Sequence, residues 1–330
     1  IKDAYTKEDG SIYTMPVKFG IPMIEGNKDI IAGITDLTTE ADAAESQKDS
    51  YGKLQFFSDF SIAPSYLIQG TIDNSIPAWM NEDGTLNENA VKEYLEQVNR
   101  IWQTQKNAIE ETKKAYQMGD DWADSDHSGY MDISGSVTSL LAKVDTVAAG
   151  GLLSPEGLVS LDSARKVDPD LDYKLLNGQS ENCFYPRSAV GVSAKASEKE
   201  AAEKFVKFLF EEESQRASNT EGLAVNSKVY EDMAYWKMGK SSGDTIGSIG
   251  ASYDTGDGNI KQIEMDEIIP EDEAIQNIMD LGKTLTVPAK SNQIIRNAVT
   301  ESGEKYLNGE TGLDDAVKEI MQEVNLYLSE

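Results

Sequence analysis

An α/β fold is the class that this 330-residue sequence predicts, because strand-like and helix-like segments alternate along most of it. Three observations carry the prediction: a strand and a helix follow one another within residues 185–226, an amphipathic pattern begins near Asn87, and another begins at Leu313. The sequence contains no internal repeat. We therefore expect strands interleaved with helices rather than a β-sandwich or a helical bundle.

The N-terminal half predicts a strand, two shorter elements and a long helix. The strand is expected to begin at Ser11. Residues 35–48 are polar, acidic and rich in Ala, which predicts a short exposed helix, and residues 54–69 are aromatic and apolar, which predicts a buried element. Behind a turn at residues 81–84, apolar side chains recur at helical spacing. They are Ala90, Val91, Tyr94, Leu95, Val98, Ile101 and Trp102.

The middle of the chain begins with a polar loop at residues 120–132, which carries five acidic side chains. An apolar stretch to Leu153 follows, and the pair Gly150 and Gly151 predicts a break in it. A helix from Ser154 and a turn at Pro169 lead to an expected strand at residues 173–176. The region therefore reads as loop, helix and strand in succession.

Residues 185–226 give the clearest local signals. Ser197 followed three residues later by Glu200 is a capping box, in which each side chain satisfies a backbone N–H of the first helical turn. The preceding strand is formed by Ala189, Val190 and Val192. In the helix, one face is apolar and is expected to be buried. It is formed by Ala201, Phe205, Phe208 and Leu209.

The remaining C-terminal part predicts a loop and a final helix. Residues 239–258 are rich in Gly and Ser and predict a flexible loop. The final helix from Leu313 places a row of apolar residues on one face. They are Ala316, Val317, Ile320, Val324 and Leu328.

Composition excludes several classes of function. The chain has 39% hydrophobic and 27% charged residues, an ordinary balance for a globular protein, and its 330 residues are long enough for two domains. A net charge of −28 repels phosphate backbones and anionic lipids, so we expect neither nucleic acid nor a membrane surface as partner. The single cysteine, Cys183, cannot form an internal disulfide. No run approaches the length of a membrane span.

Few residues could support catalysis. His127 is the only histidine and lies in a polar loop. The chain therefore has almost none of the residues needed for a Ser-His-Asp triad or for a zinc site built from histidines. Clustered carboxylates keep glycosidic hydrolysis open as an alternative. They are Asp120, Asp121, Asp124 and Asp126. Residues 81–84 and 254–258 lack the full spacing of a calcium loop, and there is no phosphate-binding loop. We expect no metal and no cofactor.

Three segments resemble the sugar-type extracellular solute-binding proteins of bacterial ABC importers. The first is DGSIYTMPVKFGIPMIEGNKDII, similar to the strand that crosses between the two lobes of these proteins. The second runs from VGVSAKASEKE through the helix AAEKFVKFLFEEESQ to EGLAVN, and the third is the closing YLNGETGLDDAVKEIMQEVNLYLSE. The order of the segments is more specific than any one of them.

The resemblance implies a periplasmic-binding-protein-like fold of type II, with two α/β lobes of which one is incomplete. Residues 1–186 with 285–330 would form the C-terminal lobe, and residues 187–284 the rest of the N-terminal lobe, whose first segment is expected to be missing. The chain begins with Ile1 and shows no secretion signal. Family members are extracellular, so we expect a cell-surface protein with a lipid on an N-terminal cysteine that this sequence does not contain.

The resemblance also suggests residues that line the cleft between the lobes. The first crossing places Lys18, Phe19 and Gly20 there, and the second places Tyr185 and Arg187. Phe19 could instead be a core residue, and Arg187 could form a surface ion pair. Three further candidates are Ser65, Tyr66 and Asn292. Many relatives have an aromatic residue where this chain has the four small residues at 148–151.

The function implied is capture of a sugar or oligosaccharide by hinge closure and its delivery to the membrane permease of an ABC importer, by a monomer that performs no chemistry. Two alternatives stay open. The chain could be a secreted carbohydrate-active enzyme that uses the acidic loop with Asp124 and Asp126. It could also be a surface binding or scaffold protein without a small ligand.

Overall fold

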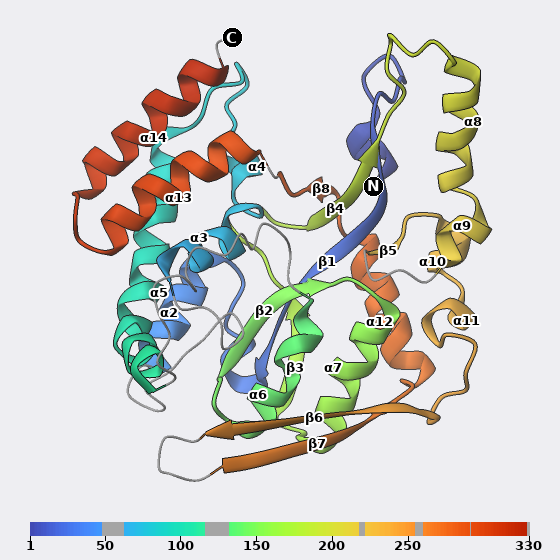
Figure 1. Ribbon diagram of the computed structural model, residues 1–330, viewed down its shortest axis with the longest axis horizontal. Helices are drawn as coiled ribbons and strands as arrows, with labels where there is room; N and C mark the ends of the chain where they lie inside the picture. Colours follow the sequence, from blue (N-terminus) through green and yellow to red (C-terminus); the bar gives the residue numbers. More distant parts are fainter. Residues whose placement is uncertain (48–62, 116–131, 218–221, 255–259, 291, 329–330) are drawn as a thin grey trace.

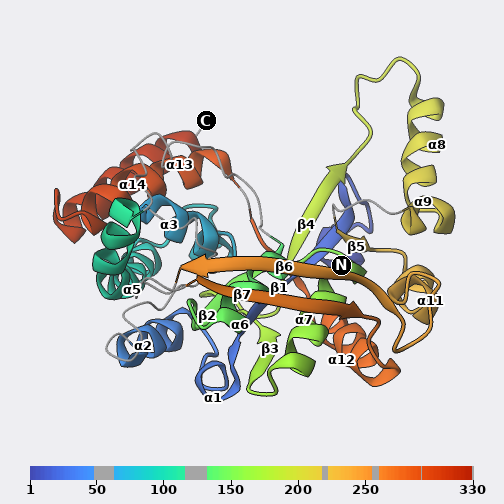
Figure 2. The same cartoon turned by 60° about the horizontal axis from the view of Figure 1, so that its bottom comes forward.

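The computed structural model describes residues 1–47, 63–115, 132–217, 222–254, 260–290 and 292–328. A mixed sheet lies at the centre, with the strand order β2-β1-β4-β8 and with β3 and β5 also paired to β1. Helices cover both of its faces, and a separate two-stranded sheet, β6-β7, packs outside them (Figures 1 and 2). The predicted α/β fold class is confirmed.

The long strand β1 (Met15–Asn27) organises the central sheet, because it changes partners midway along its length. From Met15 to Gly20 it pairs with β4 and β5, and from Ile21 to Asn27 it pairs with β2 and β3. All four pairings are antiparallel, whereas β8 runs parallel to β4. The remaining strands of the sheet are β2 (Val147–Leu152), β3 (Leu171–Leu175), β4 (Cys183–Val190), β5 (Leu223–Ala224) and β8 (Val287–Pro288).

One face of the sheet is covered by a layer of helices that includes the predicted long helix, α5. Its side chains Val91, Tyr94, Leu95, Val98 and Ile101 are buried, as the helical spacing predicted. Four buried residues of the final helix, α14, join the same core. The helices of this layer are α1 (Lys28–Ile31), α2 (Leu37–Gln47), α3 (Pro64–Ile72), α4 (Ile76–Trp79), α5 (Glu88–Ala115), α13 (Gln293–Leu307) and α14 (Leu313–Leu328).

The opposite face carries a second core. Alternation along β1 sends Met23 into this core and Ile24 into the first, because successive strand residues point to opposite faces. Ser154 caps α7 by accepting a hydrogen bond from the Gly157 N–H at 3.1 Å, so the predicted helix start is confirmed. The elements on this face are η3 (Ile133–Ser136), α6 (Val137–Ala142), α7 (Pro155–Val167), β6 (Thr245–Asp254), β7 (Ile260–Ile268) and α12 (Asp272–Lys283).

Short elements surround the end of the sheet where β1 begins. They are η1 (Lys2–Tyr5), α8 (Lys199–Leu209), α9 (Glu212–Arg216), α10 (Ser227–Tyr230) and α11 (Met233–Trp236). Figures 1 and 2 both show α8 standing away from the sheet, connected to it through α9. Among the described helices of 11 residues or more, α8 is the only one that buries none of its side chains.

Two predictions about α8 are wrong. The capping box is not formed, because the helix begins one residue later than the box requires: Glu198 is the N-cap, without a side-chain capping bond, and Glu200 pairs with Lys204 at 2.9 Å instead. The apolar face is not buried either, since Phe205 is 61% exposed and Phe208 is 48% exposed. The helical pattern was read correctly, but no described element covers it.

Two predictions about glycine-rich segments are also wrong. Residues 245–254 are not a loop but the strand β6, whose partner β7 packs on α7 through residues such as the buried Met265. Because β6 contains several Gly, Ser and Ala residues, its sequence does not show the alternation of apolar and polar residues that predicts a strand. Gly150 and Gly151 do not break the chain, because they lie inside β2, opposite Met23 and Pro22. There they give room, since a Cβ on Gly151 would lie 2.9 Å from the Leu153 side chain.

The division into residues 1–186 with 285–330 and residues 187–284 stays a prediction. Along β4, burial gives way to exposure near Arg187, close to the proposed boundary. Within 187–284, however, α12 contributes Ile275, Ile278 and Met279 to the same core as β1. Within the described ranges, no helix has both the length and the apolar character needed to cross a bilayer.

Candidate functional site

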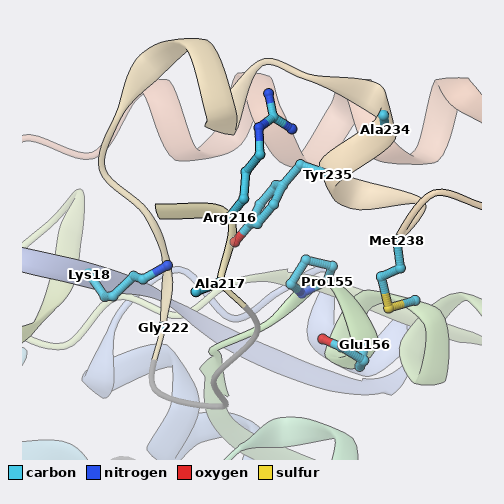
Figure 3. Close-up of a pocket in the computed structure, with 9 residues that line it drawn as sticks. All are labelled: Lys18, Pro155, Glu156, Arg216, Ala217, Gly222, Ala234, Tyr235 and Met238. Atoms are coloured by element: carbon cyan, nitrogen blue, oxygen red, sulfur yellow. The ribbon is translucent and has the colours of Figure 1, made fainter. Parts of the chain in front are cut away.

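A cavity of about 360 Å3 lies where β1 and β5 meet the start of α7 and the turn of α11 (Figure 3). Its walls come from four separate stretches of sequence. The lining residues are Lys18, Pro155, Glu156, Arg216, Ala217, Gly222, Ala234, Tyr235 and Met238. A volume of this size suits a small solute.

Lys18 supplies the cavity with a buried amine. The side chain is 5% exposed, and its Nζ donates to the backbone carbonyl oxygen of Gln215 at 2.6 Å. Burial lowers the pKa of Lys18 below its ordinary value, because removal from water disfavours the charged form. The amine is therefore held in one place at the wall, rather than extended into solvent.

Gln215 connects the cavity wall to the neighbouring elements. Its side-chain amide donates to the carbonyl oxygens of Val17 at 2.9 Å and Leu209 at 2.8 Å. Its Oε1 accepts from the N–H groups of Val225 at 2.8 Å and Asn226 at 3.3 Å. One fully buried side chain thus joins β1, the end of α8 and the segment after β5.

Gly222 directly precedes β5 and allows the chain to approach β1 closely beside the cavity. Its φ of +145° is a backbone conformation that favours glycine. A Cβ at this position would lie 2.8 Å from the Lys18 Cβ, 2.9 Å from the Phe19 carbonyl oxygen and 3.2 Å from the Arg187 Cγ. Lys18 and Arg187 are directly opposite each other in the β1-β4 pairing. The structure therefore brings these two predicted site residues together beside Gly222, and of the two only Lys18 lines the cavity.

Arg216 and Tyr235 form the upper wall in Figure 3, where the arginine extends beside the tyrosine ring. Arg216 Nη1 pairs with Asp232 Oδ2 at 2.7 Å. The Ala234 N–H and this arginine lower the pKa of Asp232. The Tyr235 hydroxyl oxygen accepts from the Ala224 N–H at 3.2 Å, and burial raises the pKa of Tyr235 to about 12. The Tyr235 side chain is therefore held by this hydrogen bond at its hydroxyl group and by packing of its ring against Trp236.

The opposite wall is the first turn of α7, with Pro155 and Glu156. Glu156 is exposed, so its carboxylate faces the solvent-filled space, and Met238 lies on the same side (Figure 3). The cavity therefore combines an aromatic ring, a carboxylate and two basic groups. Such a set can pack against a flat apolar surface and exchange hydrogen bonds with hydroxyl groups.

Three of the predicted site residues lie in or beside the core instead of lining this cavity. Phe19 is 3% exposed and packs against Phe184 and Tyr230, which is the core alternative for this residue. Gly20 lies under Leu153, whose Cδ2 would be 2.5 Å from an added Cβ. Tyr185 is buried, its hydroxyl oxygen accepts from Asn74 Nδ2 at 3.3 Å, and burial raises its pKa.

The other three predicted residues belong to the helical layer. The Ser65 N–H donates to Glu304 Oε1 at 3.2 Å, and Tyr66 packs against the core of this layer. Asn292 caps α13, since its Oδ1 accepts from the N–H groups of Ile294 and Ile295. Both views place α3 and α13 on the far side of β1 from α11 (Figures 1 and 2). The role of all eight predicted residues in solute binding stays a prediction.

Sequence reasoning missed most of the cavity. Glu156, Arg216, Tyr235 and Met238 come from segments that gave no functional signal of their own. Gly222 lies within the EGLAVN loop on which the family resemblance was noted, and that loop was the one available pointer. Sequence patterns report on residues that are close together in the chain, whereas this cavity is formed by residues up to more than 200 positions apart.

The described residues contain no cluster of acidic, histidine or cysteine side chains that could hold a metal ion. In the turn at residues 81–84, Asp83 Oδ1 accepts from the Thr85 N–H and hydroxyl, which accounts for this acidic turn without a cation. His127 and the acidic residues Asp120, Asp121, Asp124 and Asp126 lie outside the described residues, as does most of 254–258.

Comparison with solved structures shows the fold. The chain is similar to a candidate oligosaccharide periplasmic-binding protein from Synechococcus sp., with 11% identity, 100% of this chain and 76% of that chain covered, and a TM-score of 0.56. It is similar to the bacterial solute receptor AcbH, with 12% identity, 99% and 76% coverage and a TM-score of 0.52. An ABC substrate-binding protein from Listeria monocytogenes in complex with cycloalternan shows 17% identity, 100% and 75% coverage and a TM-score of 0.49.

No curated protein sequence matches the chain significantly. A family model described as bacterial extracellular solute-binding protein matches residues 1–216, well over half of the chain. The match includes β1, β4 and α8, which belong to the first two of the three segments on which the sequence resemblance was based, whereas α14, in the third, lies outside it. The chain therefore belongs to the family of bacterial extracellular solute-binding proteins.

Proposed function

We propose that this protein is the solute-binding component of an ABC importer and that it captures a sugar or an oligosaccharide in the cavity beside β1. The observation that carries the proposal is the cavity wall, in which the Tyr235 ring lies opposite Glu156, and Lys18 and Arg216 line the same cavity. Sugars present C–H faces that pack on aromatic rings, and their hydroxyl groups need both donors and acceptors. The cavity offers both.

Two of the similar structures support this class of solute. AcbH is described as having an exclusive preference for β-D-galactopyranose, and the Synechococcus protein is described as a candidate oligosaccharide-binding protein. We propose the same class of solute, carbohydrates, for this chain. Binding would proceed without chemistry, and the loaded protein, a monomer, would deliver its solute to the membrane permease.

Location follows from the same proposal. The family is extracellular, and we propose that the protein is held at the cell surface by a lipid on a cysteine outside this sequence. Cys183 is unsuited to that role, because it is buried in β4 and burial raises its pKa to about 12. Solute is expected to bind more tightly to a protein with two complete lobes than to this chain, since closure of both lobes excludes water.

The test is a thermal-shift and calorimetry screen against mono- and oligosaccharides. The screen uses the chain and, beside it, the complete product of its gene without any secretion signal. A sugar that binds the native state raises the melting temperature by mass action. For the sugar that binds, Tyr235→Leu is expected to weaken affinity about tenfold or more, whereas Tyr235→Phe keeps the ring and most of the affinity.

The matched control is Tyr327→Leu, because Tyr327 is an exposed tyrosine on α14, in the other helical layer. It should leave the affinity unchanged. Absence of binding by any sugar to the complete product would contradict the proposed solute class. Equal affinity of Tyr235→Leu and the unaltered protein would contradict the proposed cavity.

A further inference from the structure

Lys18 is a buried cation at the wall of the cavity, and no carboxylate among the described residues pairs with it. The side chain is 5% exposed, and its Nζ donates to an uncharged acceptor, the carbonyl oxygen of Gln215. The other basic residue that is buried in the described structure, Arg296, has a carboxylate partner, since its Nη1 lies 2.6 Å from Asp73 Oδ2. A buried charge without an opposite charge is costly, so Lys18 favours a bound molecule that brings a negative charge.

The Lys18 amine has hydrogen-bond donors left for such a molecule. An ammonium group carries three N–H donors, and within the described ranges one of them is used, on Gln215. Figure 3 shows the side chain extending from β1 toward Ala217, with its nitrogen on the side of Arg216 and Tyr235. The amine therefore faces the space that the cavity residues enclose.

Other positive charge gathers at the same end of the cavity. Lys18 and Arg187 are directly opposite each other in the β1-β4 pairing, where like charges repel. Arg216 lines the cavity, and its pairing with Asp232 through Nη1 leaves further guanidinium N–H groups for hydrogen bonds. Helix α7 also begins at the cavity, at Pro155, and the N-terminal end of a helix carries partial positive charge.

The only carboxylate among the described lining residues, that of Glu156, lies away from this end. Figure 3 draws Glu156 and Lys18 on opposite sides of the cavity, and Glu156 is exposed to solvent. The cavity is therefore polarised. A negative group is attracted to Lys18, whereas hydroxyl groups can donate hydrogen bonds to Glu156.

The net charge of −28 does not oppose this contact. At physiological ionic strength, exposed charges more than about 8 Å apart are largely screened, whereas buried charges are screened much less. The groups that touch the solute therefore decide which charge it carries.

We propose that the solute captured in this cavity is an acidic carbohydrate, one that carries a carboxylate as uronic acids do, and that Lys18 Nζ binds this carboxylate. The inference rests on the proposed function and narrows its solute from carbohydrates in general to uronic acids and their oligosaccharides. In this arrangement the carboxylate completes the pairing of Lys18, the sugar ring packs on Tyr235, and hydroxyl groups donate to Glu156.

The test is calorimetry of the complete gene product with glucuronate, galacturonate and digalacturonate, each beside its amide, which keeps the shape of the sugar and removes the charge. The acid is expected to bind about tenfold or more tightly than the amide, because hydrogen bonds between charged groups are the stronger ones. Lys18→Met, which keeps the length of the side chain, should bring this ratio of affinities close to one. Lys18→Arg, which keeps the charge, should restore part of it.

The pH dependence of the same ratio tests the contact without a substitution, and it remains available if Lys18→Met does not fold. Burial lowers the pKa of Lys18 from 10.5. The amine is charged below its pKa, so the preference for the acid should be full at about pH 7 and fall as the pH rises toward about 10. Tyr235 titrates above this range, because burial raises its pKa to about 12. The other described charged groups around Lys18 are Glu156 on α7, Arg187 on β4, Arg216 on α9 and Asp232 before α11.

The matched control is Lys174→Met. Lys174 lies in β3 of the same sheet, its Nζ donates to a backbone carbonyl oxygen, that of Ala32 at 3.4 Å, and burial lowers its pKa too. Because Lys174 does not line the cavity, the substitution should leave the ratio of affinities unchanged.

Equal binding of acid and amide by the unaltered protein would overturn the inference, as would a ratio that survives in Lys18→Met. Binding of neutral sugars without binding of the acids would also overturn it, and would leave the carbohydrate proposal standing. If no sugar of either kind binds, both proposals fail.

Discussion

Replacing Glu40 by Gln is expected to weaken the dependence of the free energy of unfolding on pH. Glu40 lies in α2 and is 1% exposed, and its Oε1 has no hydrogen-bond partner in the part of the chain that the structure describes. Burial, with a smaller contribution from the negative charge of Asp36, raises the pKa of Glu40 from 4.5 to about 8. The carboxyl is therefore protonated in the native state at neutral pH.

The magnitude follows from proton linkage. Between pH 4.5 and about 8 the unfolded chain loses a proton that the native state keeps. The stability from this group is fully present below pH 4.5 and is lost as pH rises through about 8, at about 1.4 kcal/mol per pH unit. The whole loss is roughly 5 kcal/mol, which is comparable to the total stability of many domains.

The assay is urea unfolding followed by circular dichroism at about pH 5, pH 6.5 and pH 8.5. At about pH 5 the Glu40→Gln variant should lie within about 1 kcal/mol of the unaltered protein, and at about pH 8.5 it should be more stable by several kcal/mol, on the order of 3 to 5. Glu310→Gln, at an exposed position, is the control and should follow the unaltered protein throughout.

A constant difference between Glu40→Gln and the unaltered protein at all three pH values would refute the reasoning. The comparison isolates Glu40 from a second buried carboxyl, Glu25, which lies in β1 with neither oxygen hydrogen-bonded among the described residues. Burial raises the pKa of Glu25 as well, so it adds the same slope to both proteins. The difference between them therefore reports only Glu40.

Three further substitutions test the packing around the sheet, each by its effect on urea unfolding. Arg296→Met removes one partner of the buried pair with Asp73, whose Nη1–Oδ2 distance is 2.6 Å, and should cost about 3–5 kcal/mol; a loss below about 1 kcal/mol would contradict it. Gly282→Ala places a Cβ against the Tyr230 hydroxyl and should cost about 1–3 kcal/mol, with partial recovery in the double variant with Tyr230→Phe. Ser154→Ala removes the α7 cap and should cost about 1 kcal/mol, whereas an unchanged midpoint would show that the cap is dispensable.

The sequence alone determined the elements whose pattern is local. The spacing of Val91, Tyr94 and Leu95 predicted α5 and its buried face, and Ser154 predicted the start of α7. Helical periodicity and capping depend on residues three or four positions apart, so they can be read before any tertiary contact is known. The order of three such segments was also enough to predict the family.

Only the tertiary structure decided what covers each apolar face and which side chains share a cavity. The pattern of α8 showed that Phe205 and Phe208 share one side, but a pattern cannot show whether that side has a partner. Likewise, Lys18 and Tyr235 meet at one cavity although they are far apart in sequence. Contacts of this kind depend on how β1 and β5 pair, and that pairing is set by packing of the whole sheet rather than by any one segment.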